Sequence, residues 1–269
     1  MLSLCRLLLN QRNHNMLNEH THEKLIEMKL FGMAAAMKER LNRVDHQSLS
    51  VSELIGLIVD DEYLYRENRK LTARLKVAKF KERTACIENI DYTSARGLRK
   101  DQVLELAQAR WIEAHQNLVI TGPSGSGKSF LAQALGQQAC RGGYTVHYIR
   151  LPSLLQQFMQ ARAQGTYAQL LKRLGKLSLL LIDDIGLSSI TEAQTQDLLE
   201  TLEERYGTGS TITTSQLPVS HWHEYLGGGR IADAILDRLI HNAHRIELSA
   251  RESMRKTAAF LPHGGQSGK

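Results

Sequence analysis

The sequence predicts an α/β fold, in which a parallel five-stranded sheet is flanked by helices and preceded by a small all-α N-terminal domain. Three observations support this prediction. A glycine-rich pattern occupies 122–129, short apolar segments alternate with helical patterns after residue 116, and the region before residue 81 has helical spacing and no proline. Strands that alternate with helices are typical of a parallel sheet, because parallel strands need crossover connections.

Composition narrows the class of protein. The 269 residues suffice for one α/β domain and a smaller module, and 42% of them are hydrophobic. A net charge of +6 favours a polyanionic partner such as nucleic acid. The cysteines at 5, 86 and 140 are too far apart for a disulfide framework or a zinc site. With no apolar run long enough to span a bilayer and no convincing signal peptide, we expect a cytoplasmic protein without a membrane partner.

The N-terminal part is expected to be a helical domain with a linker at 16–95, after a disordered extension at 1–15. Its densest basic stretch comprises Arg66, Arg69, Lys70, Arg74, Lys76, Lys79, Lys81 and Arg83. Such a stretch is either a solvated helix face or a contact with a phosphate backbone. Neighbouring aromatic residues favour the contact, so these residues are candidates for DNA binding.

The second domain is expected at 96–260, with a disordered tail at 261–269. Its strand candidates are Asn117–Thr121, Thr145–Ile149, Ser178–Asp183, Ser210–Thr214 and Arg245–Leu248. The segment between the second and third strands has room for two helices and carries Arg162, Lys172 and Arg173. In a ring-shaped assembly these basic residues would face DNA in a central channel, and exposure to solvent is the alternative.

A phosphate-binding pattern, G-x-x-x-x-G-K-[ST], is matched at each fixed position by Gly122, Pro123, Ser124, Gly125, Ser126, Gly127, Lys128 and Ser129. Glycines let the backbone curl so that successive N–H groups point at phosphate oxygens. Lys128 supplies an ammonium group, Ser129 offers a hydroxyl to Mg²⁺, and the following helix points its positive end at the anion. The pattern predicts that the chain binds ATP with Mg²⁺.

The third strand candidate ends in two carboxylates, Asp183 and Asp184. Because ligands of parallel sheets bind at the carboxyl ends of the strands, this pair is expected beside the glycine-rich loop. Asp183 would hold Mg²⁺, directly or through water, and Asp184 would orient or deprotonate the attacking water. These roles predict an ATPase in which Lys128 and Asp184 act on the reacting groups.

Three further polar residues are candidates for sensing or stabilising the transition state. The fourth strand candidate runs into Gln216, which would suit a sensor of the γ-phosphate or of water, with a structural turn as the alternative. Arg238 and Arg255 are each candidates for an arginine finger, which neutralises transition-state charge. A surface ion pair is the alternative for either arginine.

Six short segments follow one another in a fixed order: Gly122–Ser129, Leu131–Gly136, Leu181–Gly186, Thr214–Pro218, Ala234–Leu239 and Glu252–Arg255. This ordered set resembles the IstB family of insertion-sequence ATP-binding proteins, which is similar to the DnaC-type helicase loaders within the AAA+ superfamily. The resemblance spans most of the chain from about residue 25. It implies an AAA+ P-loop NTPase core that binds ATP between neighbouring subunits. Because the sequence ends soon after Arg255, we expect this core to lack a C-terminal lid domain.

The resemblance also implies partners and residue roles. It implies an N-terminal module for oligomerisation and DNA contact, an ATP-dependent homo-oligomer, and a cognate transposase of the IstA type. By position, Gln216 matches the first sensor, Arg238 the arginine finger that acts on the next subunit, and Arg255 the second sensor. The family commonly has Asp-Glu where this chain has Asp183 and Asp184, and Asn where it has Gln216. The shorter Asp184 is expected to make hydrolysis slow.

The function expected from these observations is ATP-dependent regulation of transposition. The chain would assemble on target duplex DNA with little sequence preference, recruit or stimulate its transposase, and use ATP hydrolysis to reset the assembly. The alternative is a DnaC-like replicative helicase loader, whose main partner is a protein and which binds single strands. A small-molecule kinase is disfavoured, because the sequence shows neither an acceptor-binding lid nor a second pocket.

Overall fold

The computed structural model describes residues 19–41, 50–92 and 97–249. The chain divides into two compact units, residues 1–73 and 74–269, and the division falls inside the long helix α3 (Val51–Ala78). This division lies upstream of residue 95, where the sequence analysis ended the N-terminal domain. The expected extension at 1–15, the tail at 261–269, Arg255 and the segment in which a lid would follow all lie outside the described residues.

The N-terminal unit is helical, which confirms the prediction. A helix over 19–27 and α2 (Phe31–Leu41) precede the first part of α3. α2 packs on α3 through the rings of Phe31 and Tyr65, whose centroids are 6.0 Å apart. Nearby, the N–H of Met33 donates to the carboxylate of Glu62 at 3.0 Å. The two helices are therefore joined by both apolar and polar contacts.

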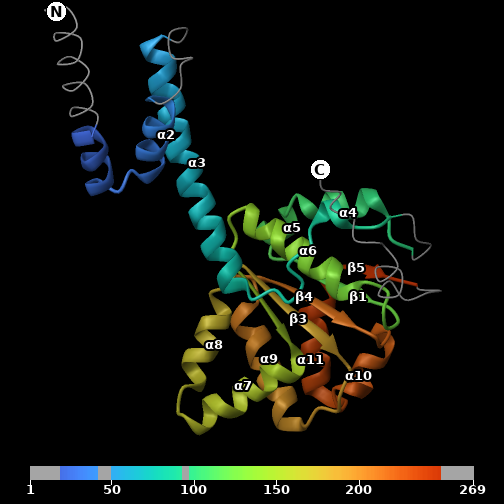
Figure 1. Cartoon of the computed structure of the whole chain (residues 1–269). Coiled ribbons are helices and arrows are strands. Elements are labelled where there is room, and N and C mark those ends of the chain that lie inside the picture. Colours follow the sequence, from blue (N-terminus) through green and yellow to red (C-terminus); the bar gives the residue numbers. More distant parts are fainter. Residues whose placement is uncertain (1–18, 42–49, 93–96, 250–269) are drawn as a thin grey trace, which may run out of the picture. The chain divides into compact units, whose positions relative to one another are not determined.

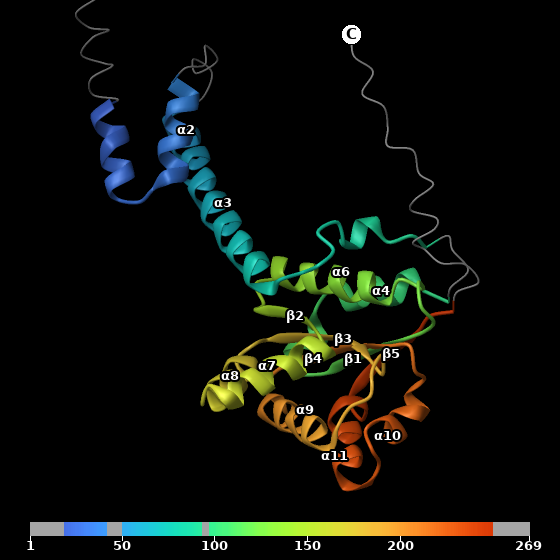
Figure 2. The same ribbon diagram turned by 60° about the horizontal axis from the view of Figure 1, so that its bottom comes forward.

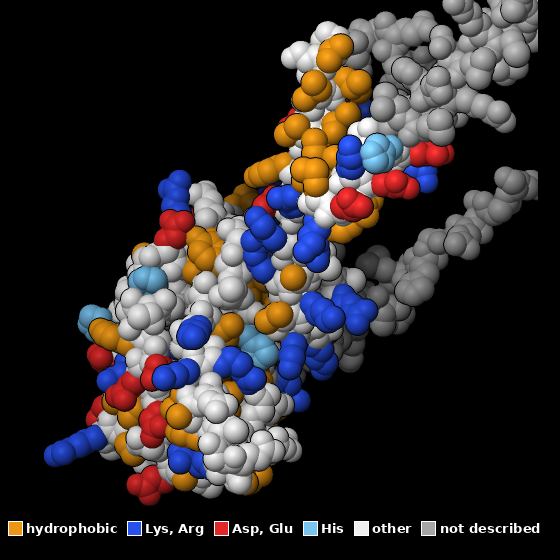
Figure 3. Space-filling view, turned by 90° about the vertical axis from the view of Figure 1, so that its left-hand side faces the viewer, with side chains coloured by type: hydrophobic (Ala, Val, Ile, Leu, Met, Phe, Trp, Pro, Cys, Tyr) orange, Lys and Arg blue, Asp and Glu red, His pale blue; other side chains and the backbone are white. Residues whose placement is uncertain are grey.

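Ser50 and Glu53 form a reciprocal cap at the start of α3. The Glu53 carboxylate accepts from the Ser50 N–H at 2.8 Å, and the Glu53 N–H donates to the Ser50 hydroxyl at 3.3 Å. This arrangement satisfies N–H groups that have no partner within the helix. Beyond the cap, α3 exposes several large apolar side chains (Figure 3), namely Val51, Ile55, Leu57, Val59, Tyr63 and Leu64.

The second unit is built on a parallel sheet with the strand order β2-β3-β4-β1-β5 (Figure 1). Its strands are β1 (Asn117–Thr121), β2 (Val146–Arg150), β3 (Leu179–Ile185), β4 (Ser210–Ser215) and β5 (Ala243–Glu247). Each strand begins and ends within two residues of its predicted position. All four pairings are parallel, so the carboxyl ends of β1, β3 and β4 lie along one edge of the sheet.

Helices cover both faces of this sheet (Figure 2), with α4 and α6 on one face and α7 to α11 on the other. The bounds are α4 (Lys100–Ala107), α5 (Arg110–Glu113), α6 (Lys128–Arg141), α7 (Leu151–Ala163), α8 (Tyr167–Gly175), α9 (Glu192–Arg205), α10 (Trp222–Tyr225) and α11 (Gly229–Ile240), with short 3-10 turns at Ile87–Asn89 and Val219–His221. Two helices, α7 and α8, fill the connection between β2 and β3, as predicted. No helix of the described segments is long and apolar enough to cross a membrane.

The core lies between the sheet and these two helical layers. Leu118 and Ile120 of β1, and Leu180 and Ile182 of β3, are fully buried, as expected for parallel strands covered on both faces. The segment that follows α3 is docked on α6: the N–H groups of residues 81 and 82 both donate to the side chain of Gln133, at 2.8 and 2.9 Å. These residues belong to the second unit, which therefore begins before the expected domain boundary at residue 95.

Candidate nucleotide-binding site

The glycine-rich loop joins β1 to α6 at the carboxyl edge of the sheet. Gly122, Gly125 and Gly127 have φ angles of 148°, 79° and 90°, which residues with a Cβ rarely adopt. Space is also restricted at Gly122, since an added Cβ would lie 2.3 Å from the carbonyl oxygen of Leu248. Glycine is thus needed at position 122 for its backbone conformation and for the close approach of the chain after β5.

Lys128 is the first residue of α6, and its side chain is buried. Its Nζ donates to the carbonyl oxygen of Pro123 at 2.8 Å, across the loop. A phosphate oxygen in the loop would offer the same ammonium group a charged acceptor, which makes a stronger hydrogen bond than a carbonyl does. The start of α6 adds free N–H groups and the positive end of the helix dipole. Together these groups form an anion-binding site.

Asp183 of β3 lies beside the loop and is 3% exposed. Its Oδ1 accepts from the hydroxyl of Ser129 at 2.8 Å and from the hydroxyl of Thr214. Its Oδ2 accepts from the hydroxyl of Tyr148 at 2.7 Å. Side chains from β2, β4 and the start of α6 therefore converge on this carboxylate of β3.

These donor groups fit Mg²⁺, which prefers oxygen ligands. The hydroxyl of Ser129 and the carboxylate of Asp183 already lie within hydrogen-bond distance of each other. Within the described residues, no Lys, Arg or His forms an ion pair with Asp183, although its carboxylate is buried. A buried charge is costly unless it is paired or binds a metal, so a cation at this position would relieve the cost.

Asp184 is held differently from Asp183. Its backbone is in the left-handed region, with φ 65°, and the register of β3 against β4 shifts between Ile182 and Ile185. The Asp184 carboxylate accepts from Nε of Arg150 at 2.6 Å. Hydrogen bonding to this carboxylate raises the pKa of Arg150. Bulges and unusual backbone angles recur at functional sites, where they redirect a side chain.

β4 approaches the carboxylate pair through Thr214. The hydroxyl of Thr214 donates to Asp183 and accepts from the N–H of Asp184 at 3.1 Å. Gln216, two residues later, is exposed. The sensor role of Gln216 stays a prediction, and Thr214 is the β4 residue that contacts both aspartates, through the carboxylate of Asp183 and the N–H of Asp184.

Sequence reasoning missed Tyr148, Arg150 and Thr214. Arg150 and Thr214 lie at or next to the carboxyl ends of their strands, where polar side chains of a parallel sheet meet its ligand, and that position was a usable signal. Tyr148 carried no such signal, because its contact with Asp183 depends on β2 lying next to β3.

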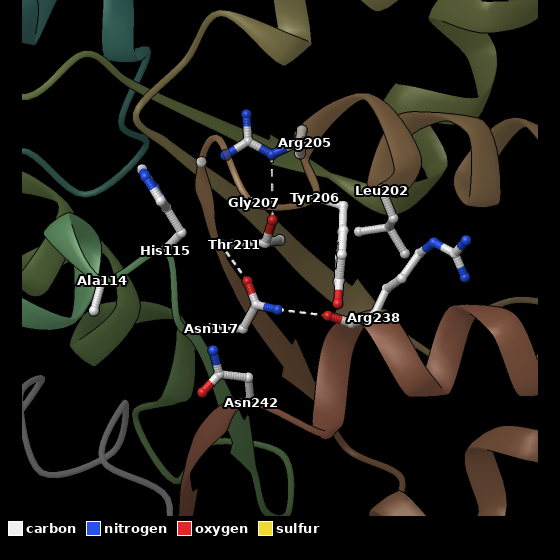
Figure 4. Close-up of a pocket in the computed structure, with 11 residues that line it drawn as sticks. Ala114, His115, Asn117, Leu202, Arg205, Tyr206, Gly207, Thr211, Arg238 and Asn242 are labelled. Carbon is white, nitrogen blue, oxygen red and sulfur yellow. Dashed lines mark hydrogen bonds between the residues drawn. The ribbon is translucent and has the colours of Figure 1, made fainter.

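Arg238 lies near the end of α11, at the amino edge of the sheet (Figure 4). Its carbonyl accepts from Nδ2 of Asn117 at 2.7 Å. Asn117 begins β1, whereas the glycine-rich loop follows the end of β1, and a strand of this length spans roughly 15 Å. The guanidinium donates to Glu203 at 2.9 Å and to the carbonyl of Ala234 at 3.0 Å. Arg238 and the loop of the same chain are therefore at opposite edges.

A cavity of about 230 Å³ lies beside Arg238, and none of its lining residues is acidic. It is lined by Ala114, His115, Asn117, Leu202, Arg205, Tyr206, Gly207, Gly209, Thr211, Arg238 and Asn242. Arg205 is fully buried, and its guanidinium donates to the carbonyls of Leu174 and Leu177, at 2.5 and 2.9 Å. Burial lowers the pKa of Arg205 to about 10. Two guanidinium groups therefore lie at the amino edge, one held by main-chain carbonyls and the other paired with Glu203.

Some of the basic residues predicted to bind DNA already contact other residues of the chain, whereas others are exposed. In the N-terminal unit, Arg66 and Lys70 pair with neighbouring glutamates, whereas Arg69 is exposed. In the second unit, the exposed residues are Lys76, Lys79, Lys81, Arg83, Lys172 and Arg173, and Arg74 is half-buried with a hydrogen bond to a carbonyl of α6.

Two of these basic segments lie close together around His147. Burial lowers the pKa of His147, and the charges of Lys79 and Arg173 lower it further. The end of α3 and helix α8 therefore present neighbouring cations. Arg162 is engaged elsewhere, because it pairs with the carboxylate of Asp197 at 2.5 Å. A DNA contact by any of these residues stays a prediction.

The fold and the loop define the class of protein. A five-stranded parallel sheet with a glycine-rich loop after β1 and a carboxylate pair on β3 is the core of a P-loop NTPase of the AAA+ type. The chain belongs to the family described as IstB-like ATP binding protein, whose model matches residues 23–260. The resemblance inferred from the motifs is therefore confirmed, and family membership supports nucleotide binding at the loop.

Individual relatives agree with this assignment. The chain is 50% identical to the insertion sequence ATP-binding protein y4pL of Sinorhizobium fredii (strain NBRC 101917 / NGR234), over 90% of this chain and 98% of the relative. It is 41% identical to the ATP-binding protein of insertion sequence IS1162 from Pseudomonas fluorescens, over 76% and 89% of the two chains.

Solved structures show the same fold. AMPPCP-bound DnaA from Aquifex aeolicus has a TM-score of 0.57 at 20% identity, over 70% of this chain and 59% of DnaA. The DnaC helicase loader has a TM-score of 0.51 at 15% identity, over 62% of this chain and 97% of the loader. At such identities the likeness concerns the fold alone.

Proposed function

We propose that this chain is an ATP-dependent, DNA-binding regulator of transposition. It assembles on target duplex DNA, recruits or stimulates its cognate IstA-type transposase, and resets by hydrolysing ATP. The observation that carries the proposal is the placement of Arg238 at the edge of the sheet opposite the glycine-rich loop. An arginine finger at that position serves a neighbouring subunit, so assembly and ATP turnover are coupled.

Nucleotide binding follows from the loop and the start of α6. Lys128 exchanges its bond to the Pro123 carbonyl for a phosphate oxygen, and the loop N–H groups hold the β- and γ-phosphates. Ser129 and Asp183 would hold Mg²⁺, which neutralises phosphate charge when it is bound. Arg255, the predicted second sensor, would contact the same nucleotide.

Hydrolysis depends on residues of two subunits. Asp184 orients or deprotonates the attacking water, and Arg238 of the neighbour stabilises the charge that develops on the phosphate. Gln216 would sense the γ-phosphate. Hydrolysis is slow for two reasons: Asp184 is one methylene shorter than glutamate, and Arg150 already binds its carboxylate. A slow reaction suits a timing step in the assembly.

Duplex contact is assigned to the basic residues of α3, the segment after it, and α8. The contact is made to phosphates, because Lys and Arg along helices meet the backbone of DNA and not the base edges. Little sequence preference and a strong dependence on salt follow from such a contact. The relatives are named as ATP-binding proteins of insertion sequences, which supports a role in transposition.

The experiment that tests this proposal measures binding to labelled duplex and single-stranded DNA of equal length. It is done with ATP, with ADP and without nucleotide, at two salt concentrations. We expect cooperative duplex binding that needs ATP and weakens at higher salt. The combined Lys79→Ala and Arg173→Ala chain should bind duplex less tightly, whereas Lys100→Ala with Arg110→Ala, two exposed basic residues elsewhere, should bind normally.

Two results would contradict the proposal. Preference for single strands, or no DNA binding in any nucleotide state, would favour the helicase loader and redirect the search to a protein partner. The transposase is tested separately, by co-sedimentation with the DNA-bound chain. Recruitment that is equal with ATP and ADP would exclude the nucleotide-dependent step.

A further inference from the structure

Tyr148 is a buried phenol in the middle of β2 whose hydroxyl reaches the predicted Mg²⁺ ligand. Its side chain is 7% exposed, and the hydroxyl donates to Oδ2 of Asp183 at 2.7 Å. A phenolic hydroxyl carries its proton at neutral pH, so Tyr148 is the hydrogen-bond donor in this contact.

The bond to Tyr148 fixes the orientation of the Asp183 carboxylate. Rotation about the terminal bond of an aspartate side chain is soft, so a carboxylate held at one oxygen alone still turns. In this site Oδ1 faces the hydroxyls of Ser129 and Thr214, while Tyr148 holds Oδ2. Tyr148 thereby keeps Oδ1 directed at the glycine-rich loop.

The sheet register explains why β2 provides this contact. Tyr148 pairs with Leu181 and Arg150 pairs with Asp183, and alternate residues of a strand share one face. Tyr148 and Arg150 therefore share one face of β2. Tyr148 reaches Asp183 from that face, and Arg150 reaches Asp184 where the backbone of β3 is irregular. The two contacts differ in charge. The neutral hydroxyl of Tyr148 donates to Asp183, whereas the guanidinium of Arg150 donates to Asp184.

We propose that Tyr148 is a positioning residue for Mg²⁺ binding. It orients Asp183 so that the carboxylate and the Ser129 hydroxyl meet the ion together. The inference rests on the nucleotide and Mg²⁺ binding proposed above for this site. Residues that orient a metal ligand from behind typically change metal affinity about 10- to 100-fold when they are substituted.

The test compares Tyr148→Phe with a matched control, Tyr144→Phe. Both substitutions remove one phenolic oxygen, and the Tyr144 hydroxyl donates to Glu113 at 2.9 Å, outside the site. Affinity for a fluorescent N-methylanthraniloyl ATP is measured in EDTA and then at rising Mg²⁺. For Tyr148→Phe we expect unchanged affinity in EDTA and a half-saturating Mg²⁺ concentration about 10-fold higher or more. Tyr144→Phe should match the wild type in both conditions.

Two outcomes would overturn the inference while leaving nucleotide binding intact. One is a half-saturating Mg²⁺ concentration within about twofold of the wild type. The other is an equal loss of affinity with and without Mg²⁺, which would assign Tyr148 to packing alone. A wild-type chain that binds no nucleotide, or binds it without any Mg²⁺ dependence, would instead contradict the proposed function, and the inference would fall with it.

A second variant keeps the test independent of stability. Thermal unfolding in EDTA identifies a temperature at which every variant is folded, and the titrations are done there. In an Asp183→Asn background the charged acceptor of the phenol is gone, so adding Tyr148→Phe should change the Mg²⁺ dependence by less than about twofold. A full additive loss in the double variant would show that Tyr148 acts by some route other than Asp183.

Discussion

The carboxyl edge of the parallel sheet surrounds a buried carboxylate, whereas the amino edge holds two guanidinium groups. At the carboxyl edge, hydroxyl groups surround the buried carboxylate of Asp183, which has the ligands for a cation but no cationic side chain paired with it among the described residues. At the amino edge, main-chain carbonyls surround Arg205, and Arg238 lies beside a cavity, paired with Glu203. The comparison teaches that, under the proposed function, the loop and the finger are separated within one chain, so a neighbouring subunit would have to complete the site.

Mixing two inactive variants gives the largest expected effect. Lys128→Ala damages the loop and Arg238→Ala the finger, and each alone should lower ATP turnover by about 10³-fold. In an equal mixture, about a quarter of the contacts join an intact loop to an intact finger, so about a quarter of the turnover should return. A turnover assay on DNA measures it.

Arg230→Ala is the control for this mixture, because Arg230 is exposed on the same helix as Arg238. It should keep nearly full turnover. If the mixture of inactive variants recovers nothing, the finger does not act between subunits, and the division of labour between the two edges is wrong.

A methyl group placed at Gly122 tests how tightly the carboxyl edge is built. Gly122→Ala should lower nucleotide affinity by about 30-fold or more, because the new Cβ meets the Leu248 carbonyl and the positive φ is strained. Gly165→Ala is matched in having a positive φ, 69°, but faces open space. It should cost only about 1–2 kcal/mol of unfolding free energy, with normal nucleotide affinity. Equal nucleotide affinity for both variants would contradict the role of the close approach.

Asn117→Ala tests the amino edge. Asn117 accepts from the N–H of Thr211 at 2.8 Å and donates to the carbonyl of Arg238 at 2.7 Å, so its loss should cost about 2 kcal/mol of unfolding free energy. Turnover by the assembly should fall, while nucleotide affinity stays normal. Denaturant unfolding and nucleotide titration separate the two effects. Asn242→Ala removes an exposed side chain from the lining of the same cavity. It should change neither the free energy of unfolding nor the turnover by much.

The smallest expected effect is an increase in ATP turnover. Asp184→Glu lengthens the side chain by one methylene, which brings the carboxylate closer to the attacking water and away from Arg150. Turnover on DNA should rise several-fold, with unchanged affinity for ATP. A rate equal to or below that of the wild type would refute the idea that the short side chain is what slows hydrolysis.

Prediction from sequence succeeded where local pattern is enough. The strand Asn117–Thr121 was predicted at its observed bounds, and the glycines that follow have the positive φ angles that the phosphate-binding pattern requires. Both depend on residues that are neighbours along the chain. The same holds for the helices of the N-terminal unit, which follow from helical spacing and the absence of proline.

Contacts between strands could not be predicted in this way. The bond from Tyr148 to Asp183 requires β2 to lie beside β3, and no local pattern states the strand order. The position of Arg238 at the far edge depends likewise on how α11 packs under β1. Asp184 points toward Arg150 because β3 has a register shift and a positive φ angle at this residue, and no local sequence pattern predicts either.

The two ends of β1 also limit how copies of the chain can join in an assembly. Its last residue leads into the glycine-rich loop and its first residue anchors Arg238, so the two surfaces that must meet are different surfaces of the molecule. Copies joined in this manner stack head to tail, and such a contact either closes into a ring or leaves an open row. An open row ends in one unused loop and one unused finger, so it completes one site fewer than it has subunits. Such a row would therefore have a polarity, with a free loop at one end and a free Arg238 at the other.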